Sequence, residues 1–130
     1  MSDNFEAWKN YSFTQTAGAV TADIAISPAV GPNERFEVAD GLVTVDAAAT
    51  TAGGTSVRVG FGAAVVPAAS STANTPAVGV LFDHQGVAAG SGGPLMGGIG
   101  ARGEELRAQV ADPTVGSVVI TFRGRVIQAA

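Results

Sequence analysis

The feature that most constrains this fold is a set of short segments in which apolar and polar residues alternate. One such segment carries Leu106, Ala108 and Val110, with Arg107 and Gln109 between them. Successive side chains of a β-strand point to opposite sides of a sheet, so a period of two predicts a strand with one buried face. The pattern therefore favours sheet over helix.

The same alternation recurs between turn-forming residues along most of the chain. Gly124 keeps the phase of the last segment, which indicates a close approach of two backbones there. A chain of 130 residues has room for one core of ordinary size. Short strands at this spacing predict an all-β, single-domain β-sandwich of the jelly-roll type. The predicted strands include residues 20–26, 56–61, 78–82, 95–99, 106–110 and 118–126.

One apolar series changes phase in its middle. Its members are Phe36 and Val38, which share one parity, and Val43 and Val45, which share the other. Asp40-Gly41 could form a two-residue type I′ hairpin turn that brings the two pairs together on one face. A β-bulge at the same step would achieve this within one long strand. Local turn chemistry favours the hairpin.

The first sixteen residues differ in composition from the rest of the chain. They hold half of all the aromatic residues, namely Phe5, Trp8, Tyr11 and Phe13. Aromatic side chains are favoured anchors at protein interfaces. We therefore predict an extended N-terminal arm over residues 1–16 that binds a partner through these four rings, ahead of a β-sandwich over 17–130. The alternative is that the rings fold back and plug one end of the domain.

The inventory of reactive side chains is small, with one His, one Lys and no Cys beside 18 Gly. We predict that the chain is not an enzyme and has no catalytic residues and no cofactor. A G-x-G-x-x-G match at residues 98–103 lacks the βαβ context that dinucleotide binding requires. The run G-S-G-G-P-L at 90–95 resembles the surroundings of a serine-protease nucleophile, but it lacks the Asp before Ser91.

Charge and ligand types exclude further classes of function. The single His84 cannot build a His-based metal site, and the spacing of Asp83, Glu104, Glu105 and Asp112 matches no EF-hand loop, so no metal is predicted. Paired carboxylates for glycoside hydrolysis are sought among Glu34, Glu37, Asp40 and Asp46, which are interpreted as solvated. A net charge of −4 leaves no basic footprint for nucleic acid, and Arg123 with Arg125 makes only a weak patch. The chain contains no run of 18 apolar residues, so no membrane span is predicted. Residues 1–10 lack the apolar stretch of a secretory signal.

The C-terminal two-thirds of the chain resembles small virion structural proteins of tailed bacteriophages and related prophages. The likeness lies in "VRVGFGAA" followed by "GVLFDHQGVAAGSGGPLMGGIGARGEELRAQVADPTVGSVVITFRG". Its shared features are a His-Gln-Gly turn, a Gly-Ser-Gly loop, a G-x-G-A-x-G-E-x-L stretch and a closing β-hairpin. The upstream "ERFEVADGLVTVDA" is similar to a long jelly-roll strand in such proteins, which favours the bulge over the hairpin.

The resemblance implies a head decoration, or cement, protein. Such a protein is made in the host cytoplasm and sits on the outer capsid surface of the virion, where it clamps neighbouring major capsid subunits. A homo-oligomer, with a trimer favoured, would multiply weak contacts. An extended arm would gain a partner by strand addition. The alternatives are a receptor- or carbohydrate-binding module of a tail fibre or spike, and a minor head–tail or tail component.

Overall fold

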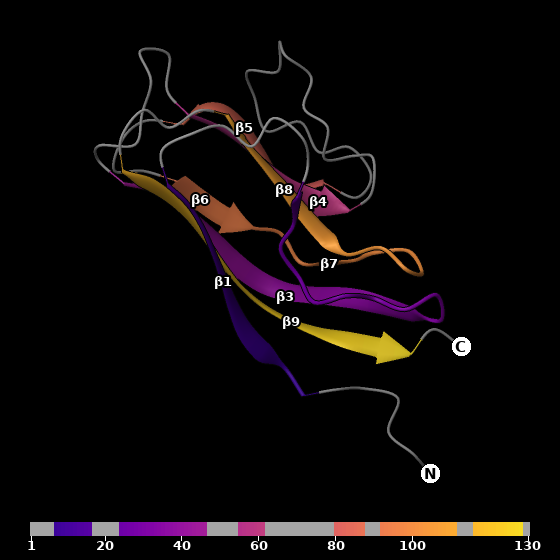
Figure 1. Ribbon diagram of the computed structural model, residues 1–130. Helices are drawn as coiled ribbons and strands as arrows, with labels where there is room; N and C mark the ends of the chain where they lie inside the picture. Colours follow the sequence, from indigo (N-terminus) through magenta and orange to yellow (C-terminus); the bar gives the residue numbers. More distant parts are fainter. Residues whose placement is uncertain are drawn as a thin grey trace.

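The structure, a computed structural model, describes residues 7–16, 24–46, 55–61, 80–87, 92–111 and 116–128. All regular structure in these ranges is β-strand, arranged in two antiparallel sheets that pack face to face (Figure 1). The predicted all-β sandwich is confirmed. The strands are β1 (Lys9–Thr16), β2 (Ile24–Ala25), β3 (Glu34–Val45), β4 (Thr55–Phe61), β5 (Val80–Val87), β6 (Gly92–Leu95), β7 (Gly98–Ile99), β8 (Leu106–Ala111) and β9 (Ser117–Gln128).

Each of the two sheets combines strands from the N-terminal and C-terminal halves of the chain. Sheet A has the order β1-β9-β3-β6, with β7 also paired to β3, and sheet B has the order β2-β8-β4-β5. In Figure 1, β1, β9 and β3 form the lower layer, and β4, β5 and β8 form the upper layer. The first strand of the chain therefore lies next to the last, which brings N-terminal aromatic residues beside C-terminal arginines.

The core lies between the sheets and consists of the side chains that the alternation predicts. In β4 and β8, every second residue from Val57 to Phe61 and from Leu106 to Val110 is buried. In β9, the inward residues are Val118, Ile120, Phe122 and Val126, all buried. Burying one such side chain stabilises the fold by about 1.5–3 kcal/mol. The thin, Val-rich layer of side chains matches the predicted sandwich.

The phase change between Val38 and Val43 is caused by a β-bulge. β3 is one continuous strand paired with β9, and their register shifts between Val38 and Asp40. Ala39 is the extra residue, so the apolar residues on both sides of it point inward. The bulge interpretation is confirmed, and the hairpin turn at Asp40-Gly41 is wrong. Pairing with β9 along both halves of β3 outweighs the local turn preference.

The bulge coincides with a break in the segment that pairs with the other side of β3. Leu95 of β6 lies opposite Gly41, and Gly98 of β7 lies opposite Val38, so the interruption at Met96-Gly97 faces the bulge. A Cβ on Gly97 would lie 3.0 Å from the Ala39 carbonyl oxygen. The single strand predicted at 95–99 is therefore two short strands, β6 and β7, separated beside the bulge.

The structure does not confirm a separate arm over residues 9–16. Lys9–Thr16 forms β1, which pairs antiparallel with β9 along its whole length. Tyr11 and Phe13 are partly buried and pack against the core, as in the alternative in which the rings fold back. Phe5 and the predicted boundary after residue 16 lie outside the described residues, as does the 20–23 part of the strand predicted at 20–26.

Gly124 is the close approach that the sequence indicates. The Phe36 ring lies over it, and a Cβ at position 124 would lie 2.5 Å from Phe36 Cζ and 2.9 Å from the Glu37 carbonyl oxygen. Phe36 is fully buried and meets the Phe122 ring edge to face, with centroids 6.0 Å apart. Glycine at this point of β9 therefore makes space for a fully buried phenylalanine ring.

We expect Gly124→Ala to lower the free energy of unfolding by about 1–3 kcal/mol, because the added methyl group overpacks against the Phe36 ring and backbone. Urea denaturation would measure the change. Gly31→Ala is the control, because its closest contact is the flexible Glu34 carboxylate. The control should change stability by less than about 1 kcal/mol. Equal stability of Gly124→Ala and wild type would contradict the close packing.

Candidate interaction surface

The outer face of sheet A carries an indole ring held by two arginines. Trp8 precedes β1, and the register of β1 with β9 places it beside Arg123 and Arg125. The Arg125 Cζ lies 4.1 Å from the centroid of the Trp8 ring, and the Arg123 Cζ lies 5.5 Å from it. Such cation–π contacts at exposed sites contribute about 0.5–1 kcal/mol each. They fix the ring on the sheet although 37% of the residue stays exposed.

The same two arginines form ion pairs with β3 on their other side. Arg125 Nε donates to Glu37 Oε1 at 2.9 Å, and Arg123 Nη2 donates to Asp40 Oδ2 at 3.1 Å. The two carboxylates share the outer face because the bulge lies between them. We call these five residues, Trp8, Glu37, Asp40, Arg123 and Arg125, the arginine ladder. It links β1, β9 and β3 across the sheet.

The two ion pairs of the arginine ladder differ in exposure. The side chains of Arg125 and Glu37 are 22% and 31% exposed, whereas those of Arg123 and Asp40 are 47% and 66% exposed. Solvent screening weakens an exposed pair more than a partly buried one. The Arg125–Glu37 pair is therefore the stronger link, and the Arg123–Asp40 pair is more accessible to a binding partner.

The inner face of β1 anchors the strand in the core. The Tyr11 ring stacks on Phe122 with centroids 5.2 Å apart and meets Phe36 edge to face at 5.8 Å. Phe13 lies opposite Ile120 on the same inner face. Aromatic pairs of this kind contribute about 0.5–1.5 kcal/mol beyond their buried area. β1 is therefore held by Tyr11 and Phe13 inside and by Trp8 outside.

The four predicted anchor residues are thus not gathered on one surface. Trp8 lies on the outer face of sheet A, whereas Tyr11 and Phe13 point toward the core. Phe5 lies outside the described residues. Of the predicted anchors that the structure describes, Trp8 is the one available to a partner as a side chain.

The outer edge of β1 is available for pairing with a partner strand. In the described part of the chain it pairs only with β9, and that pairing has no register shift. The other sheet edges carry features that protect against strand addition: β2 has 2 residues, β6 contains Pro94, and the pairing of β5 with β4 shifts twice. β1 is the long, regular edge among the described strands.

An open depression on the outer face shares Asp40 and Arg123 with the arginine ladder. Its volume is about 530 Å³, and β1, β9 and β3 all contribute to it. Tyr11, Gly41 and Phe122 face inward, so their backbone forms the floor. The outward side chains around it are Asn10, Ser12, Asp40, Leu42, Thr121 and Arg123.

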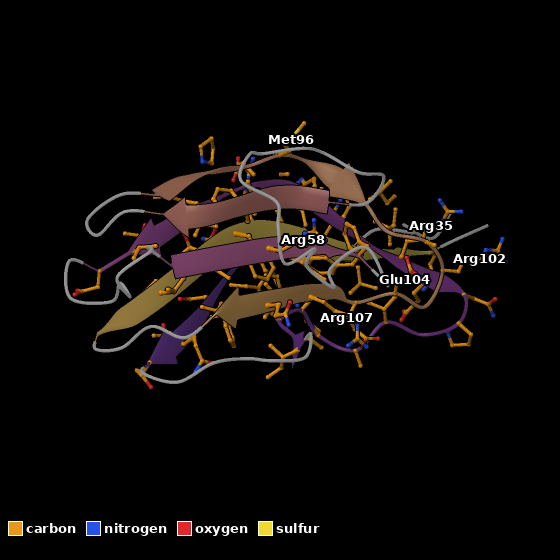
Figure 2. The ribbon with its side chains drawn as sticks, turned by 90° about the horizontal axis from the view of Figure 1, so that it is seen from above. Arg35, Arg58, Met96, Arg102, Glu104 and Arg107 are labelled. Atoms are coloured by element: carbon orange, nitrogen blue, oxygen red, sulfur yellow. The ribbon has the colours of Figure 1, made fainter. Side chains whose placement is uncertain are left out.

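Three exposed apolar residues lie on β3 and on the β6–β7 segment paired with it. Leu42, Ile99 and Met96 are 49%, 47% and 59% exposed. Leu42 lies opposite Pro94, and Ile99 lies opposite Glu37. Figure 2 shows Met96 at the margin of the molecule, and its backbone N–H donates to the Leu81 carbonyl oxygen of β5 at 3.0 Å. The exposure of Met96 and Ile99 could not be predicted from alternation, because the irregular β6–β7 segment has no clear period.

The glycine motifs have structural roles in the described residues. In the G-x-G-x-x-G match, the Gly100 and Gly103 N–H groups donate to the carbonyl oxygens of Phe36 and Glu34 at 3.0 and 2.9 Å. Gly103 has a φ of +74°, which favours glycine at this turn. The later part of the G-S-G-G-P-L run is strand β6, whereas Ser91 lies outside the described residues.

A metal site in the described part of the chain would require a cluster of acidic or His side chains. Among the residues that the structure describes, no group of three or more His, Cys, Asp or Glu side chains could hold a metal ion. The backbone of His84 belongs to strand β5, opposite Val57, and not to a turn as predicted. Glu37 and Asp40 bind arginines across the sheet and are not simply solvated.

The comparisons with known proteins identify no family. No family model matches the sequence, and no curated protein matches it. Within the described ranges, no helix is long and apolar enough to cross a membrane.

Double-mutant cycles would test the arginine ladder. We expect a coupling energy of about 1 kcal/mol between Arg125 and Glu37, and about 0.3 kcal/mol between Arg123 and Asp40, because the second pair is more solvated. The variants are the single and double Ala substitutions, compared by urea denaturation at low salt. Equal couplings, or a larger one for Arg123–Asp40, would show that exposure does not control these pairs.

Proposed function

We propose that this protein is a head decoration, or cement, protein of a tailed-bacteriophage virion. It binds major capsid subunits on the outer capsid surface and stabilises the head without catalysing a reaction. The observation that carries the proposal is the β1 side of sheet A, where a regular edge strand and a half-exposed Trp8 adjoin. The resemblance of the C-terminal two-thirds to phage virion proteins supports the same role.

The edge of β1 suits adhesion to a capsid subunit. A partner strand that adds to this edge gains main-chain hydrogen bonds, and side chains beside it provide specificity. Trp8 and the arginines offer the aromatic and guanidinium groups that are enriched at interface centres. Because Tyr11 and Phe13 hold β1 in place, the edge is ordered before binding.

The strand order supports the jelly-roll interpretation of the sandwich. From β1 to β4, and again from β8 to β9, successive strands lie in opposite sheets. Such crossing connections characterise double-sheet jelly rolls. In this sandwich, the outer face of sheet A and the edge of β1 are available to neighbouring protein subunits. A homotrimer of such bodies would contact several capsid subunits at once, and the combined contacts would resist separation.

Reconstitution on particles that lack the protein would test the role of β1. We expect Trp8→Ala, and deletion of residues 1–8, each to lower capsid occupancy by about tenfold, because both remove an interface anchor. Both variants retain the strand Lys9–Thr16. Arg107→Ala, on β8 of sheet B, is the control and should bind like wild type. Full occupancy of the deletion variant would contradict the proposed contact.

Cryo-electron microscopy of particles that carry the protein would test the proposal as a whole. The expected density for the sandwich lies on the outer capsid, between neighbouring major capsid subunits. Density at a tail fibre or spike would instead favour the receptor- or carbohydrate-binding module. Density at the head–tail junction or in the tail would favour the minor tail component. Either of these positions would overturn the cement function.

A further inference from the structure

The open depression on sheet A has the surroundings of a small-ligand site. Its rim carries hydrogen-bonding side chains from three strands, with Asn10 and Ser12 from β1, Thr121 from β9 and Asp40 from β3. Small-ligand sites combine an apolar or backbone floor with a few polar groups that fix orientation. Here the inward-facing residues Tyr11, Gly41 and Phe122 present only backbone to the outer face, so no side chain fills the floor.

The charges around the depression favour a neutral ligand. Asp40 and Arg123 are the two charged lining residues, and the Arg123 Nη2 already donates to Asp40 Oδ2 at 3.1 Å. An anion would meet the Asp40 carboxylate at close range and would compete with it for Arg123. A neutral ligand rich in hydroxyl groups can donate to Asp40 and accept from Arg123 without breaking their pairing, since both side chains remain about half exposed or more.

An aromatic ring lies next to the depression, although it is not one of the lining residues. Trp8 lies on the outer face of the chain two residues before Asn10, and its ring contacts Arg123, which lines the depression. An aromatic face carries partial negative charge and attracts the polarised C–H groups of an apolar ligand surface. A pyranose ring presents both chemistries, with C–H groups on its faces and hydroxyl groups around its edge.

We propose that this depression binds a neutral saccharide. Asp40 accepts hydrogen bonds from sugar hydroxyl groups, Arg123 and Asn10 donate to sugar oxygens, and the Trp8 ring packs beside the pyranose at the rim. The site goes beyond the proposed cement function and does not rest on it, because it belongs to a single protomer. A saccharide bound here would give the protein an attachment to glycan-coated surfaces.

Titration of the full-length protein with neutral oligosaccharides would test the site. The probes are maltotriose, cellotriose, mannotriose and tri-N-acetylchitotriose, each followed by backbone amide NMR shifts. We expect one of them to shift the amides of residues 10–12, 40–42 and 121–123. Asp40→Asn should weaken that binding by about tenfold, because it removes a charge-assisted acceptor. Trp8→Ala should weaken it to a similar degree.

A matched control separates a site from general surface effects. Thr44→Ala changes an outward residue on the same strand as Asp40 but outside the depression, so binding should stay within about twofold of wild type. The proposal is overturned if no probe shifts these amides at about 10 mM, a concentration that detects even millimolar affinity. It is also overturned if inorganic phosphate displaces the sugar, or if the shifts map to another face.

Discussion

The β-bulge at Ala39 is the constraint on which both faces of sheet A depend. A regular strand from Glu34 to Val45 would turn either its first or its second set of apolar residues toward solvent, because side chains alternate strictly. The extra residue restores a common inward face, with Phe36 before the bulge and Val43 after it. The same shift places Glu37 and Asp40 together on the outward face. One inserted residue therefore determines the core and the arginine ladder together.

The bulge also requires changes in the strands beside it. On one side, Gly124 of β9 leaves space for the Phe36 ring. On the other side, the sheet is interrupted at Met96-Gly97, where any side chain on Gly97 would crowd the Ala39 carbonyl. Gly41, just after the bulge, has Leu95 and the Thr121 carbonyl where a Cβ would stand. The glycines of this region are therefore explained by packing around an irregular strand, and not by a phosphate-binding loop.

The fold could be predicted from the sequence wherever burial follows a strict period. The buried side chains of β4, β8 and β9 are those that the alternation of apolar and polar residues predicts, because each of these strands has one face toward the core and one toward solvent. The hairpin that local turn chemistry favoured at Asp40-Gly41 does not form, because turn preference is local, whereas the pairing of β3 with β9 joins residues about eighty positions apart. A long-range pairing of this kind leaves no mark within a short window of sequence.

The surface was harder to predict than the core for the same reason. Trp8 and Arg125 are separated by most of the chain, and only the register of β1 on β9 brings the ring under the guanidinium group. Treating Arg123 and Arg125 as a weak basic patch missed their carboxylate partners on β3. The alternation along the last strand predicted that both arginines face outward. Their partners on β3 could not be predicted, because the bulge determines which residues lie opposite them.

The placement of the N-terminal rings changes how adhesion at this edge would work. A disordered arm must lose conformational entropy when it docks, and that cost reduces the net affinity. β1 is instead already extended, with Tyr11 packed against both Phe36 and Phe122 and with Trp8 held by two arginines. A partner strand would meet main-chain groups in their final geometry. The aromatic residues near the N-terminus therefore favour binding by fixing the edge as much as by contacting the partner.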